Sequence, residues 1–233
     1  MKKLVFYSAK NTNGKNDAIG AFIPESEEFA KLHRIDDCDR YGINCSGIKE
    51  ATRRENLLTV LRSQNENSIE AIAFFCHGWS KGIQFGIGMK QIEELCRVFS
   101  VVCREDVKIV LYACWAADAD GIADTGAVGP GTDGGFADKL RDGMLRVGLG
   151  GGWVDAHKKE GHTTKNPMLV RFDVDPVADE DGDFDLPGGY WIVQPRSPLW
   201  GRWRRALAET DLKYRFPFMT ETEIREALIE SSE

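Results

Sequence analysis

Two apolar stretches, IEAIAFFC at residues 69–76 and VKIVLYAC at residues 107–114, decide the fold class of this chain. Neither alternates apolar with polar residues, which is typical of strands buried on both faces of a parallel sheet. An expected crossover helix near residues 90–99 separates them, and its apolar residues recur at helical spacing: Ile92, Leu95, Cys96 and Phe99. The pattern predicts two neighbouring parallel strands joined by a helix.

The segments outside this unit repeat the alternation of strands and helices. We expect further strands at residues 4–9, 149–156 and 166–174, and further helices at residues 49–64 and 136–147. This order predicts an α/β domain over residues 1–194 with a mainly parallel sheet. Residues 195–233 are expected to form a small helical C-terminal extension that packs on the domain through an apolar stripe: Leu199, Trp203, Ala206 and Leu207.

Composition narrows the classes of partner. The 233 residues carry a formal net charge of −7, which argues against nucleic acid and acidic membranes as partners. No apolar run reaches the roughly 18 residues that a membrane span needs. The six cysteines show no CxxC pair or zinc-finger spacing, and several lie in apolar strand or helix patterns, where a free thiol acts as a small apolar group. We therefore expect a cytoplasmic protein.

A histidine and a cysteine stand where the two apolar strands end. His77 and Gly78 follow the first strand, and Cys114 closes the second. In parallel sheets, sites form beyond the carboxyl ends of the strands. An imidazole there could take the proton of the thiol, and the N–H groups of Gly78 and Cys114 could form an oxyanion hole. The alternative for either stretch alone is a simple His-Gly turn or a buried cysteine.

These two motifs, FFCHG at residues 74–78 and LYAC at residues 111–114, resemble the caspase-like cysteine peptidases. The family includes caspases, metacaspases, gingipains, separases and bacterial CHAT proteases, and the resemblance spans roughly residues 3–172. It implies a caspase-type α/β/α sandwich with His77 as general base and acid and Cys114 as nucleophile. The chain departs from the family at Tyr112, where many members carry an acid, and at the bulky Trp115.

Acidic residues near the second motif suggest a substrate preference. Asp118 and Asp120 follow Cys114 in a loop without a basic residue, and Asp155 closes a predicted strand. In caspase-like peptidases the loops beyond the nucleophile and the next strand bind the residue before the cleaved bond, so these acids favour lysine or arginine there. The alternative is a solvated loop. His157, also near the end of that strand, is expected to be a loop or substrate-contact histidine.

No cofactor is expected to be required. An acidic stretch at residues 173–185 offers carboxylates for Ca²⁺, but it lacks the spacing and closing Glu of an EF-hand, and a solvated loop is favoured. The candidate ligands would be Asp179, Asp181 and Asp183.

The sequence thus predicts a cysteine endopeptidase that cleaves protein substrates, with a homodimer or a regulatory partner compatible with the resemblance. The rival hypothesis is a catalytically inactive caspase-like interaction module, which Tyr112 and Trp115 favour. A third hypothesis is an unrelated doubly wound binding domain in which the two motifs meet by coincidence.

Overall fold

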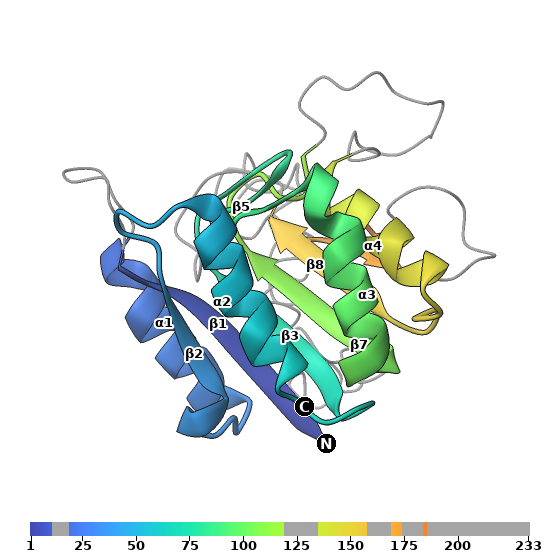
Figure 1. Cartoon of the computed structure of the whole chain (residues 1–233), viewed down its shortest axis with the longest axis horizontal. Coiled ribbons are helices and arrows are strands. Elements are labelled where there is room, and N and C mark those ends of the chain that lie inside the picture. Colours follow the sequence, from blue (N-terminus) through green and yellow to red (C-terminus); the bar gives the residue numbers. More distant parts are fainter. Residues whose placement is uncertain (11–18, 119–134, 158–168, 174–183, 186–233) are drawn as a thin grey trace, which may run out of the picture.

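The computed structural model describes residues 1–10, 19–118, 135–157, 169–173 and 184–185 (Figure 1). The predicted C-terminal extension over residues 195–233, Asp120 and the three calcium-ligand candidates, Asp179, Asp181 and Asp183, lie outside these ranges.

A mainly parallel sheet forms the centre of the molecule, with the strand order β10-β9-β8-β7-β3-β1-β2. The strands from β2 to β8 in this order run parallel, and antiparallel β9 and β10 extend the sheet beyond β8. Their bounds are β1 (Lys2–Lys10), β2 (Arg40–Asn44), β3 (Ile69–Phe75), β7 (Cys103–Tyr112), β8 (Trp153–His157), β9 (Leu169–Asp173) and β10 (Phe184–Asp185). The prediction of an α/β domain with a mainly parallel sheet is confirmed.

Helices cover both faces of the sheet. The described helices are α1 (Ile19–Leu32), α2 (Glu50–Arg62), α3 (Ile92–Val102) and α4 (Phe136–Arg146). Helices α2, α3 and α4 lie side by side over one face, where alternate residues of β3 and β7, such as Phe74 and Leu111, form the larger core (Figure 1). Helix α1 packs on the other face, where Phe22 and Phe29 contact a smaller cluster around Phe75.

The strands β3 and β7 form the central pair that the sequence predicts. Their paired residues run in parallel register from Ala71 opposite Lys108 to Phe75 opposite Tyr112. Helix α3 connects them, and Ile92, Leu95, Cys96 and Phe99 are all buried on it, as their spacing predicts. Because a parallel crossover returns the chain to the same edge, β3 and β7 end side by side.

A small antiparallel sheet lies between β3 and α3. It consists of three two-residue strands, β4 (Gly78–Trp79), β5 (Gly82–Ile83) and β6 (Ile87–Gly88), in that order. Because β4 begins three residues after the end of β3, this small sheet covers the carboxyl edge of the main sheet (Figure 1).

Candidate active site

The register of β3 and β7 brings the two motifs together. Phe75 pairs with Tyr112, and the Cys76 N–H donates to the Tyr112 carbonyl at 3.4 Å, which continues the pairing past the end of β3. His77 and Cys114 follow two residues after the last pair on each strand. Since neighbouring strands lie about 4.8 Å apart, the two residues occupy adjacent places at one edge of the sheet.

The small sheet and α1 position His77. The backbone N–H of His77 donates to the Gln84 side-chain oxygen at 3.3 Å, and the N–H of Gln84 donates to the His77 carbonyl at 2.8 Å. The Phe22 ring meets the imidazole edge-to-face, with 5.1 Å between ring centres. The imidazole is half-buried, so its orientation is constrained while part of it stays accessible.

Cys114 lies in a strained turn. The Ala116 N–H donates to the Ala113 carbonyl at 3.3 Å, so Cys114 and Trp115 are the central residues of a β-turn. Trp115 has a φ of 61°, at the turn position where glycine is usual. A bulky residue in this region costs free energy and persists only where its surroundings hold it. The Ala117 N–H, which donates to the His157 carbonyl at 3.0 Å, ties the turn to β8.

The other positive-φ residues have ordinary local explanations. Among the described residues other than glycine, Arg34 and Asn67 share this conformation with Trp115. Arg34 follows the end of α1, where the Ile35 N–H donates back to the Ala30 carbonyl, as in a usual helix C-cap. Asparagine tolerates the left-handed region better than most residues. The turn after Cys114 is therefore the unusual one.

Gly78 lies directly against the turn. A Cβ atom built on Gly78 would meet the Ala113 Cβ at 2.7 Å and the Cys114 carbonyl oxygen at 2.9 Å, closer than real side chains approach. Only glycine allows this backbone contact. Gly78, the residue after His77, thus lies against Ala113 and Cys114, which follow directly after the end of β7.

Burial separates Cys114 from most of the other thiols. All six cysteines are free; Cys114 is half-buried and Cys38 is exposed. The other four are buried: Cys45, Cys76, Cys96 and Cys103. Desolvation raises the pKa of each of these thiols, and it raises that of Cys96 to about 12. A buried thiol with a raised pKa is unreactive. Reactivity is therefore expected only at Cys38 and Cys114.

The acidic candidates differ in their distance from Cys114. Asp118 is half-buried, and its N–H donates to the Trp115 carbonyl at 3.0 Å, so it belongs to the same set of turns. Asp155 is only 2% exposed and pairs with Val110, four residues before Cys114. Val110 is two residues before the last residue of β7, so Asp155 lies about 7 Å below the end of the strand, and the turn with Cys114 begins beyond that end. Asp118 is the nearer acid.

Three contacts around the site were not predicted from the sequence. Two of them involve His77: its hydrogen bond to Gln84 and its ring contact with Phe22. The third is the packing of His157, which is 1% exposed, against Tyr112, with 5.6 Å between the ring centres. His157 is the last residue of β8 rather than a loop residue. The only signal in the sequence was its place at the end of a predicted strand, next to the strand that carries Cys114.

The described residues contain one group with metal-ligand geometry, made by Asp36, Cys38 and Asp39. It lies far along the chain from both motifs, and Asp39 already forms an ion pair with Lys2 at 2.9 Å. Exposed acidic groups of this kind are common without a metal.

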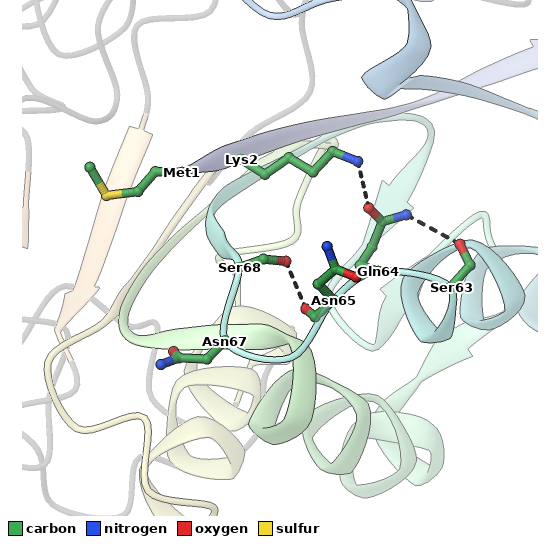
Figure 2. Close-up of a pocket in the computed structure, with 7 residues that line it drawn as sticks. All are labelled: Met1, Lys2, Ser63, Gln64, Asn65, Asn67 and Ser68. Carbon is green, nitrogen blue, oxygen red and sulfur yellow. Dashed lines mark hydrogen bonds between the residues drawn. The ribbon is translucent and has the colours of Figure 1, made fainter.

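Two cavities lie at the opposite, amino edge of the sheet. One, of about 480 Å³, is lined by Met1 and by polar residues around the start of β1 and the turn before β3 (Figure 2). Its polar groups bond to one another: Lys2 donates to Gln64 at 2.8 Å, and Ser68 donates to the Asn65 carbonyl at 2.7 Å. A second cavity of about 320 Å³ is lined by residues such as Lys3 and Arg104. Neither cavity is lined by His77 or Cys114.

Comparison with known proteins adds no relative: the chain matches no family model and no curated protein. Among the described residues, no helix is long and apolar enough to cross a membrane.

Proposed function

We propose that this protein is a cysteine endopeptidase of the caspase-like type, with Cys114 as nucleophile and His77 as general base and acid. One observation carries the proposal. His77 and Cys114 each follow two residues after the last pair of the neighbouring strands β3 and β7, and Gly78 packs against Ala113 and the Cys114 carbonyl.

Each group has a defined task in this reaction. His77 takes the thiol proton, and the Cys114 sulfur attacks the carbonyl carbon of the scissile peptide bond. The N–H groups of Gly78 and Cys114 donate to the oxyanion that forms. The C–N bond then breaks, His77 gives its proton to the leaving amine, and an acyl-thioester remains. Water, deprotonated by His77, hydrolyses the thioester and restores the thiol.

The fold and the strain at the turn support this proposal. The two residues lie at the carboxyl edge of a mainly parallel sheet, where α/β proteins place their sites. Strained backbone is retained most often at functional positions, and Trp115 directly follows the proposed nucleophile.

Tyr112, a main argument for an inactive interaction module, has a packing role. It is 1% exposed and stacks on Phe75 with ring centres 4.6 Å apart. Core packing therefore explains why an aromatic residue stands at position 112, and its presence is not evidence that the protein is inactive. The six free thiols are also in keeping with a reducing compartment such as the cytoplasm.

A preference for lysine or arginine before the cleaved bond is part of the proposal. Asp118 is the best candidate for recognising such a residue, because it is half-buried in the turns that follow Cys114. Asp155 is the weaker candidate, because it is 2% exposed and pairs with Val110 inside the sheet.

Peptide cleavage tests the proposal directly. We expect the purified protein to cleave fluorogenic peptides with lysine or arginine before the cut faster than those with aspartate, with and without Ca²⁺. Cys114→Ala should abolish cleavage, and Cys38→Ala, which removes the other accessible thiol, should leave it unchanged. Cleavage that survives Cys114→Ala would contradict the proposal, and a protein without cleavage of any peptide would favour the interaction module.

A further inference from the structure

Large apolar side chains are exposed at few places in the described part of the chain. They are Met1, Ile23, Trp79, Val101 and Leu145. Three of them belong to the amino edge of the sheet. Met1 precedes β1, Val101 lies near the end of α3, which leads into β7, and Leu145 lies near the end of α4, which leads into β8. Ile23 and Trp79 remain.

These two residues lie near the candidate active site. Ile23 follows Phe22, whose ring contacts His77. Trp79 follows Gly78, whose backbone touches Cys114. Trp79 is 42% exposed, although it is a large aromatic residue one position away from that contact. The backbone of Trp79 is therefore one residue from the contact with Cys114, and its indole is open to solvent.

Backbone packing holds Trp79 in place. It pairs with Gly82 across the small sheet, and a Cβ atom on Gly82 would lie 3.2 Å from the indole Cζ2. The ring thus lies over a glycine with no side chain to displace it. The next residue, Ser80, accepts a hydrogen bond from the Phe136 N–H at 2.9 Å, which fixes β4 to the start of α4. The backbone that carries the ring is therefore fixed before a ligand binds, which lowers the entropic cost of binding.

We infer that Trp79 forms an apolar subsite that binds an apolar side chain of the peptide substrate, within a few residues of the cleaved bond. This inference rests on the proposed function. An apolar group that covers the indole removes apolar surface from water, so peptides with leucine or phenylalanine at the matching position bind more tightly. The substrate class becomes an extended peptide with one apolar residue close to the basic residue that Asp118 would recognise.

Binding to the Cys114→Ala protein measures this preference without the reaction. Each fluorescein-labelled peptide has a central lysine and carries phenylalanine, leucine, glycine or aspartate at one of the three positions on either side. The fluorescence anisotropy of the labelled peptide gives the Kd of each. At one position we expect phenylalanine or leucine to bind about tenfold or more tightly than glycine. Adding Trp79→Ala should remove this difference, and Trp79→Phe should keep most of it. Val101→Ala, which truncates an exposed apolar residue at the other edge, should not change it.

The outcomes separate this inference from the proposed function. If the wild-type protein cleaves peptides through Cys114 but no position prefers an apolar residue, the inference is wrong and the peptidase stands. An equal loss of affinity for all peptides in Trp79→Ala, glycine included, also overturns it. If the wild type cleaves no peptide and Cys114→Ala binds none, the proposed function fails and the inference fails with it.

Discussion

The two edges of the sheet handle polar groups in opposite ways. At the amino edge, charged and amide side chains pair with one another, as Lys2 does with Gln64 (Figure 2) and Arg104 does with Asp106. At the carboxyl edge, His77 and Cys114 stay half-buried, Trp79 two residues after His77 is exposed, and Trp115 has a positive φ. The paired side chains of the amino edge stabilise the fold. At the carboxyl edge, the positive φ of Trp115 costs folding free energy. That cost is the reason to look for function at the carboxyl edge.

Gly78→Ala should have the largest effect, because its methyl group would need the space of Ala113 and Cys114. We expect peptide cleavage to fall by about a hundredfold or more if Gly78 donates to the oxyanion. Overpacking should lower the free energy of unfolding by about 1–3 kcal/mol. Kinetics and urea unfolding measure the two effects.

Gly151→Ala at the amino edge is the matched control. A Cβ atom there would first meet Asp106 at 3.5 Å, an ordinary contact. Cleavage should stay at the wild-type rate. If the two variants lose activity equally, the carboxyl edge has no special role.

Alkylation by iodoacetamide tests whether His77 acts on the thiol. A thiol with an ordinary pKa of about 8.5 is only a few per cent ionised at pH 7. We expect Cys114 to react faster than the exposed Cys38, and His77→Ala to slow Cys114 by roughly tenfold while leaving Cys38 unchanged. Peptide mapping by mass spectrometry gives both rates. Equal rates at the two thiols in the wild type would argue against a working pair.

The buried thiols should resist the same reagent over a wide pH range. Burial raises the pKa of Cys96 to about 12, so this thiol stays protonated as the pH rises from 7 to 9. The exposed Cys38 should be labelled throughout that range. Labelling of Cys96 at pH 9 in the folded protein would show that the core opens at that pH.

The sequence predicted the parts of the site that depend on local pattern. The uninterrupted apolar runs before His77 and Cys114 indicated β3 and β7, and helical spacing indicated α2, α3 and α4. Helix α1 was not predicted because Pro24 interrupts its pattern and its apolar residues pack on Phe75, far along the chain.

The small sheet was also missed, for a different physical reason. Its strands have two residues each, too short to show a period. They depend on glycine contacts with distant backbone, as Gly78 makes with Cys114. Nothing local in the sequence shows which backbone a glycine will touch, so the support of His77 by Gln84 was visible only in the structure.

Glycine and alanine at position 115 should reveal the strain in the turn. Both remove the indole, but only alanine keeps a Cβ atom at a φ of 61°. We expect Trp115→Gly to be more stable than Trp115→Ala by about 1 kcal/mol. At Trp79, an ordinary strand position, the order should reverse, because glycine there only adds flexibility to the unfolded chain. Thermal and urea unfolding of the four variants would show it. If the alanine variant is more stable than the glycine variant at both positions, residue 115 does not have a strained positive φ in solution.

The smallest effect is expected at the amino edge, from Asp106→Asn. Arg104 donates two hydrogen bonds to this carboxylate, at 2.8 and 3.3 Å, and these bonds lower the pKa of Asp106 below its ordinary value of 3.8. A lowered folded-state pKa stabilises the protein above the unfolded value, and this contribution disappears as the pH falls through the folded one. Because the pair is exposed, Asp106→Asn should cost less than about 1 kcal/mol at pH 7. In urea unfolding, the wild type and the variant should converge as the pH falls below the lowered folded-state pKa of Asp106. A larger cost, or any loss of peptide cleavage, would mean that the two edges are coupled and that the contrast between a stabilising and a functional edge is too simple.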